Sequence, residues 1–198
     1  LSQYVVVPYD MLAYLFLAIG IYLVHEGPAE PRRLGALCAV MVLAALTRET
    51  AAIILSYYFA IHFDALARPS RTASGALSHR VALGILVACF IAVYIGLRMW
   101  FGTSESTVYH RTRGLQDLTE NFSLVGGVFF LASIGLALLH ERARRTSLLF
   151  VAASAPYWIT IFLVCNPREI RLWVPVLFPL LLIQLRGDAR RGTRQATA

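Results

Sequence analysis

Long apolar blocks alternate with short polar segments along most of the chain. The blocks are about 13 to 21 residues long, which is typical of helices that cross or nearly cross a hydrocarbon core of about 30 Å. They run over Pro8–Val24, Leu34–Leu46, Thr50–Phe63, Val81–Phe101, Phe122–Leu139, Leu148–Cys165 and Ile170–Leu185. This pattern predicts an all-α fold, a polytopic transmembrane helical bundle with about seven spans.

The composition supports a membrane protein without a separate water-soluble domain. Hydrophobic residues make up 58% of the 198 residues, and the mean hydropathy is +0.65. Charged residues make up only 15%, whereas a soluble domain carries about 25%. We therefore expect a single transmembrane domain over residues 1–185, followed by a basic, disordered cytoplasmic tail over residues 186–198.

The second and third blocks are short, and one helix over Leu34–Phe63 is the alternative. Such a helix would be about 45 Å long, which overshoots a hydrocarbon core of about 30 Å. With seven spans and the N-terminus outside, the inner segments hold twelve of the 18 arginines, whereas fusing the two blocks gives at best about ten. The positive-inside rule thus favours seven spans, a cytoplasmic C-terminus and a multi-pass protein of the inner (plasma) membrane.

The net charge of +7 comes entirely from arginine, because the chain contains no lysine. These arginines lie in short segments between apolar blocks, so we interpret them as topology signals and expect no nucleic-acid partner. The sequence contains no HExxH, GxSxG or P-loop motif and no His/Cys cluster with metal-ligand spacing. We therefore assign no metal-binding residue.

Two charged segments interrupt the apolar pattern. The first charged joint is Thr47–Glu49, and the second charged joint is Asn166–Arg171. A charge at the centre of a membrane helix costs about 2.5–3.5 kcal/mol on insertion scales, so a chain that keeps one usually uses it. The predicted topology places both joints on the outer side. Capping of short helices and snorkelling to the interface are the structural alternatives.

The residue types at these joints suit an anionic ligand. The planar fork of arginine binds two phosphate oxygens at once, and a neighbouring carboxylate acts as a base or holds the arginine in place. The candidate substrate-binding residues are Arg48, Arg168, Arg171, His110 and Arg111, the last two in a long outer loop. The candidate catalytic carboxylates are Asp10, Glu49 and Glu169, and helix capping is the alternative for Asp10.

Two stretches resemble elements of the polytopic GT-C superfamily of glycosyltransferases. Leu46-Thr47-Arg48 resembles a Leu-Thr-(Lys/Arg) joint between spans, and Glu169, Arg171, Trp173 and Pro175 match a late Glu-x-Arg-(aromatic)-x-x-Pro element. The resemblance implies transfer of a sugar from a polyprenyl-phosphate carrier at the outer membrane face. It also implies a base in the first external loop and, in many members, a divalent cation.

On this resemblance we expect an integral membrane glycosyltransferase, or part of one, whose partners are membrane lipid and a lipid-linked sugar. The alternatives are a non-enzymatic transporter or flippase for an anionic lipid or solute, and a structural membrane subunit. The chain begins at Leu1 without a Met, and the usual N-terminal span and acidic external loop are not identifiable. We therefore expect a C-terminal fragment that lacks an N-terminal segment of the same protein.

Replacing Arg171 tests the proposed role of the second charged joint. We expect Arg171→Ala to abolish sugar transfer, because the variant loses the fork that binds the lipid phosphate, while membrane insertion is kept. Transfer is measured on isolated membranes, and insertion by resistance to alkaline extraction. Unchanged turnover in the variant would contradict the assignment.

Overall fold

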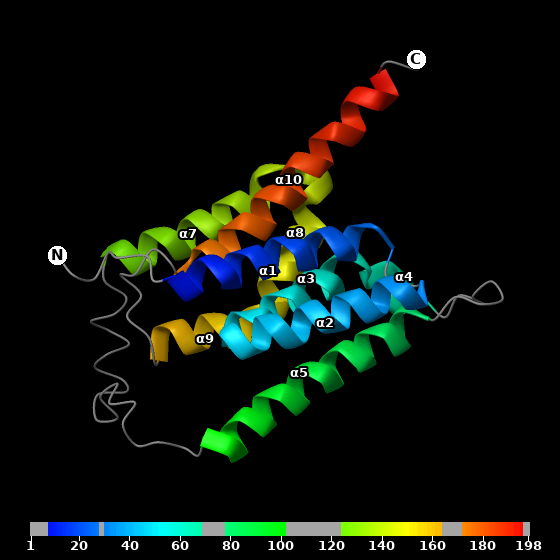
Figure 1. Ribbon diagram of the computed structural model, residues 1–198. Helices are drawn as coiled ribbons and strands as arrows, with labels where there is room; N and C mark the ends of the chain where they lie inside the picture. The colour runs from blue at the N-terminus through cyan, green and yellow to red at the C-terminus, as the bar shows by residue number, and fades with distance from the viewer. Residues whose placement is uncertain (1–7, 28–29, 69–77, 102–123, 164–171, 196–198) are drawn as a thin grey trace. The chain divides into compact units, whose positions relative to one another are not determined.

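The computed structural model describes residues 8–27, 30–68, 78–101, 124–163 and 172–195, and every regular element in these ranges is a helix. This confirms the predicted all-α class. The α-helices are labelled in Figure 1 as α1 (Pro8–His25), α2 (Pro31–Thr47), α3 (Ala52–Ile61), α4 (Phe63–Ala67), α5 (His79–Phe101), α7 (Leu124–Leu139), α8 (Glu141–Ala153), α9 (Ala155–Leu163) and α10 (Val174–Gln195). A short 3-10 helix, η2 (Glu49–Ala51), lies between α2 and α3.

The chain groups into two compact units, unit 1 over Leu1–Val108 and unit 2 over Tyr109–Ala198. In unit 1, α2 packs against α1 and α5, and α3 contacts the same two helices. In unit 2, α8 packs against α7 and α10, which also contact each other. The single domain expected over residues 1–185 stays a prediction.

Helix α1 shows how the apolar pattern becomes a packed face in unit 1. Its core side carries buried residues at helical spacing, and its other side carries exposed apolar residues. The buried set is Asp10, Ala13, Leu17, Ile21 and Val24, and the exposed set is Met11, Leu15, Ile19 and Tyr22. Because the outward side is as apolar as the inward side, the helix does not have the polar outer face of a soluble bundle.

A glycine lets α1 approach α3 closely. A Cβ atom added at Gly20 would lie 2.6 Å from Cδ1 of Ile54, a residue that is fully buried on α3. Helix α1 ends where Gly27, at φ 95°, takes the left-handed conformation that glycine adopts without strain. Pro31 then opens α2, where the missing N–H is no loss.

The structure decides between one helix and two over Leu34–Phe63. Helix α2 ends at Thr47, because Arg48 is extended at φ −165° and ψ 148°. The chain then turns through η2 into α3. The single-helix alternative is therefore wrong, and the break falls at the charged residue that suggested it.

In unit 2 the helices differ from the sequence prediction at two places. The segment from His140 to Ser147 separates two of the predicted apolar blocks, but in the structure it contributes the first turns of α8, which begins at Glu141. The apolar block Leu148–Cys165 is divided at Ser154, whose hydroxyl donates to the Phe150 carbonyl at 2.7 Å. Pro156 has no N–H to donate to the carbonyl four residues earlier, and its ring clashes with that carbonyl. A continuous helix is therefore interrupted, and a second helix, α9, begins at Ala155.

Two hydrogen bonds set the register of α10 against α8 and α9. Gln184 Nε2 donates to Ser147 Oγ at 2.9 Å, and the Tyr157 hydroxyl donates to the Leu172 carbonyl at 2.7 Å. From the first bond to the second, the residue number rises from 147 to 157 on α8 and α9, whereas it falls from 184 to 172 on the partner segment. Helix α10 therefore runs antiparallel to α8. Helix α10 continues to Gln195, through part of the segment 186–198 that was expected to be disordered.

Within the described residues, one helix is long and apolar enough to cross a membrane by itself, the His79–Leu97 part of α5. Only 11% of its 18-residue apolar window is buried. Shorter apolar helices cover Asp10–His25, Ala52–Ile61, Gly126–Leu139 and Val174–Arg186. The bundle of seven spans therefore stays a prediction.

Substitution of Gly20 tests the close approach of α1 and α3. We expect Gly20→Val to lower the free energy of unfolding by about 1–3 kcal/mol, because the new side chain has to displace Ile54. Gly84→Val on α5 is the matched control, since no atom lies within 4 Å of a Cβ added there. Thermal unfolding in detergent measures both variants, and equal losses would contradict the packing.

Candidate functional site

The first charged joint has a well-defined backbone. The Thr47 hydroxyl donates to the Ala44 carbonyl at 2.7 Å, and the Arg48 N–H donates to the same carbonyl at 2.8 Å. These two bonds satisfy one of the carbonyls left open at the end of α2. The Arg48 carbonyl in turn accepts the Ala51 N–H at 3.2 Å, which begins η2. Arg48 is thus the one extended residue between two helical segments.

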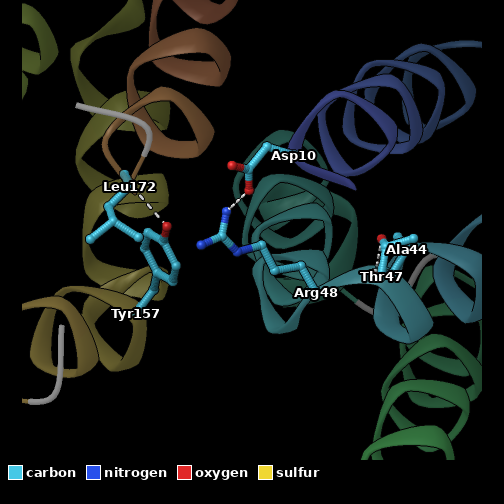
Figure 2. A network of polar contacts seen from close by, with 6 residues as sticks. All are labelled: Asp10, Ala44, Thr47, Arg48, Tyr157 and Leu172. Carbon is cyan, nitrogen blue, oxygen red and sulfur yellow. Dashed lines mark hydrogen bonds and ion pairs between the residues drawn. The ribbon is translucent and has the colours of Figure 1, made fainter. Parts of the chain in front are cut away.

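The side chains of Asp10 and Arg48 point toward each other within unit 1 (Figure 2). It belongs to the first turn of α1, where a carboxylate is favoured by the helix dipole. Arg48 Nη1 donates to Asp10 Oδ1 and forms an ion pair with it. The Asp10 side chain is fully buried, whereas 19% of the Arg48 side chain is exposed. The ion pair therefore joins the start of α1 to the break after α2.

This geometry suggests a positioning role for Asp10, and the catalytic role expected from the sequence stays a prediction. A carboxylate that is buried against a guanidinium holds that guanidinium in place, and its charge is already compensated. Arg48 remains partly accessible and carries N–H donors on three nitrogens, the arrangement that suits phosphate oxygens. The pair can thus present a cation of fixed orientation at the edge of an apolar bundle.

The remaining predicted site residues are not placed by the structure. Glu49 begins η2, but its side chain lies outside the described part. The other candidates fall on residues outside the described ranges; they are His110, Arg111, Arg168, Glu169 and Arg171. Whether the two charged joints converge on one site therefore stays a prediction.

The residue that follows the second charged joint is firmly held in unit 2. Trp173 is fully buried and contacts the rings of Phe129, Trp158 and Phe162 at centroid distances of 5.4–5.8 Å. The neighbouring Leu172 carbonyl accepts the hydrogen bond from Tyr157 (Figure 2). The tryptophan of the Glu-x-Arg-(aromatic) stretch thus has a packing role in this unit.

Sequence reasoning missed a second polar cluster in unit 1, built by the ends of α1 and α3 and the start of α5. Its members are His25, Tyr57, Tyr58, His62 and His79. His25 Nε2 contacts the Tyr57 hydroxyl, and His79 Nδ1 lies 3.0 Å from the Tyr58 hydroxyl. The His62 ring stacks on His79 at 4.4 Å and donates from Nε2 to the Val24 carbonyl at 3.1 Å.

A sequence signal for this cluster existed. Three of the five histidines stand at the inner ends of the predicted first, third and fourth spans, where the topology brings them together. The tyrosines alone suggested packing, because both lie within an apolar block. Polar contacts at this end and the Asp10–Arg48 ion pair at the other fasten α1 at both of its ends.

Among the described residues, no group of three or more His, Cys, Asp or Glu side chains is arranged to hold a metal ion. The divalent cation implied by the family resemblance stays a prediction. The chain matches no family model, no curated protein and no solved structure.

A double-mutant cycle tests the buried ion pair. We expect Arg48→Gln to destabilise by about 3 kcal/mol, because it leaves the Asp10 carboxylate buried without its cation. Asp10→Asn should cost less, since Arg48 is partly exposed. The double variant should be more stable than the sum of the two predicts, by about 1–3 kcal/mol. Denaturant unfolding in micelles measures all four proteins.

An exposed ion pair provides the control for this cycle. Arg33 Nε lies 3.2 Å from Glu30 Oε2, and the two side chains are 42% and 53% exposed. The coupling energy of this pair should be below about 1 kcal/mol. A coupling energy between Asp10 and Arg48 as small as that of the control would show that the buried pair contributes little.

Proposed function

We propose that the chain is an integral membrane glycosyltransferase, or part of one, that takes a sugar from a polyprenyl-phosphate donor at the outer face of the membrane. The observation that carries the proposal is the Asp10–Arg48 ion pair, a cation held by a buried carboxylate between apolar helices. A polyprenyl phosphate combines one anionic group with one long hydrocarbon chain. Its phosphate matches the cation of Arg48, and its hydrocarbon chain matches the apolar surfaces of the surrounding helices.

The apolar outer surface supports a membrane location. Large hydrophobic side chains are exposed on every helix of 13 or more residues, including Met99 and Trp100 at 81% and 84%. A soluble protein rarely exposes contiguous apolar patches larger than a few hundred Å². In a membrane, lipid acyl chains would cover these exposed apolar side chains, including those on the unburied face of α5.

In this proposal Arg48 binds the phosphate of the donor through its guanidinium. Asp10 is a positioning residue, because it fixes the arginine and does not need to exchange a proton. The roles expected from the sequence for Arg168, Arg171, Glu169 and Glu49 in phosphate binding stay predictions. The loop that contains His110 and Arg111 would cover the acceptor. No step is assigned to a metal ion.

Binding of undecaprenyl phosphate tests the role of Arg48. Loss of a charge-assisted hydrogen bond costs about 1.5–3 kcal/mol, so we expect Arg48→Gln to bind this lipid about tenfold to a hundredfold more weakly. The measurement uses the full chain in nanodiscs. Arg32→Gln, at an exposed position on α2, is the control and should bind as the wild type does.

The double variant Asp10→Asn/Arg48→Gln separates binding from folding, because it leaves no unpaired buried charge. We expect it to be less destabilised than Arg48→Gln alone, to stay folded, and still to lose affinity for undecaprenyl phosphate. Full affinity in a folded double variant would mean that the ion pair is only structural. Turnover of a polyprenyl-phosphate sugar by the complete protein distinguishes a transferase from a transporter, which would move the donor without cleaving it.

A further inference from the structure

Four exposed arginines lie at one end of unit 2, and we call this group the basic collar. Its members are Arg142, Arg144, Arg145 and Arg186. The first three belong to the opening turns of α8, and the fourth lies on α10. Glu141 is the exposed acidic residue described among them. The group therefore carries a net positive charge within the described residues.

The register of unit 2 brings the members of the basic collar to one level. Gln184 and Ser147 form a hydrogen bond between α10 and α8, which run antiparallel. Arg186 lies two residues beyond this bond on α10, about 3 Å along the helix axis, and Arg144 lies three residues beyond it on α8, about 4.5 Å along the axis. Because the helices are antiparallel, both displacements point toward the same end.

Exposed leucines border the basic collar. Leu138 and Leu139, the last residues of α7, are 43% and 67% exposed, and Leu185, directly before Arg186, is 63% exposed. Leu148, in the turn of α8 after the arginines, is 40% exposed. On α8 and α10 the outer surface thus changes from leucine to arginine at the end of the unit where α7 finishes in two exposed leucines. This change is what a boundary between hydrocarbon and lipid headgroups demands.

We propose that the basic collar binds the phosphate groups of anionic phospholipids in the cytoplasmic leaflet. The inference rests on the membrane location in the proposed function, but it concerns a different surface and a different lipid. A phospholipid places acyl chains on the leucines while its phosphate meets the guanidinium groups. A nucleic acid would use the arginines and leave the leucines exposed to water, so the leucine border favours lipid.

The predicted topology agrees with this leaflet, because it places both His140–Ser147 and the end of the chain on the cytoplasmic side. The sequence beyond Arg186 adds Arg190, Arg191 and Arg194 against Asp188 alone. Anionic lipids give the cytoplasmic leaflet a negative surface potential, and each arginine near such a surface contributes about fivefold in affinity.

Lipid retention by the full chain tests the proposal. The protein is transferred to a mild detergent, and native mass spectrometry compares bound phosphatidylglycerol with phosphatidylcholine of identical acyl chains. We expect the wild type to prefer phosphatidylglycerol. The variant Arg144→Gln/Arg186→Gln should bind phosphatidylglycerol about 25-fold more weakly, at about fivefold per arginine, with phosphatidylcholine unchanged.

Two further variants and two competitors make the result specific. Arg144→Lys/Arg186→Lys retains the charges and should retain most of the preference, whereas Glu141→Gln removes the neighbouring negative charge and should strengthen it. Inorganic phosphate should compete only weakly, because it has no acyl chains to cover the leucines. Equal retention of the two lipids by the wild type, an unchanged preference in the glutamine variant, or displacement by short RNA or by phosphate at equal concentration would each overturn the proposal.

Separate readouts distinguish this inference from the proposed function. The basic collar variant should insert into membranes and bind undecaprenyl phosphate as the wild type does, since Arg48 belongs to unit 1. If the basic collar variant loses the preference for phosphatidylglycerol and still binds undecaprenyl phosphate fully, the result supports phospholipid binding by the basic collar and does not bear on the proposed function. A wild type that inserts but shows no lipid preference contradicts the collar and leaves the proposed function standing.

Discussion

The ion pair between Asp10 and Arg48 is the interaction on which the arrangement of unit 1 depends most. A carboxylate buried among apolar side chains is tolerated only with a cation beside it, and the cation has to arrive from another segment of the chain. Here it arrives from the single extended residue between α2 and η2. One electrostatic requirement thus specifies where α2 ends, which side of α1 faces inward and how the two meet.

The apolar periodicity of the sequence predicted most helices, because burial and helix period are both local properties. It also predicted the break at Arg48, since a charge interrupts an apolar run there. It did not predict that α8 begins at Glu141, because arginines and glutamate are good helix formers as well as good connectors. The division at Ser154 depended on Pro156, a proline within an apolar block that helices sometimes tolerate.

The candidate site was predictable in its residues and not in its contacts. Arg48 and Asp10 were both identified from sequence, yet nothing in the sequence shows that they pair, because 37 residues lie between them. The polar cluster around His62 and His79 was missed for the same reason: its members are isolated in sequence and meet only when three helices pack. Contacts between segments that are distant in sequence form only in the tertiary structure, and the apolar periodicity of the sequence does not predict them.

Helix α1 has polar contacts near both ends, at Asp10 and at His25, and its core face runs between them. His25 follows Asp10 by fifteen positions, which at 3.6 residues per turn places the two about 60° apart around the axis. Inserting or deleting one residue between them would rotate one end by about 100° and break one of the two contacts. The exposed side, with Met11, Leu15 and Tyr22, can accept many apolar substitutions, whereas the length of this segment cannot change.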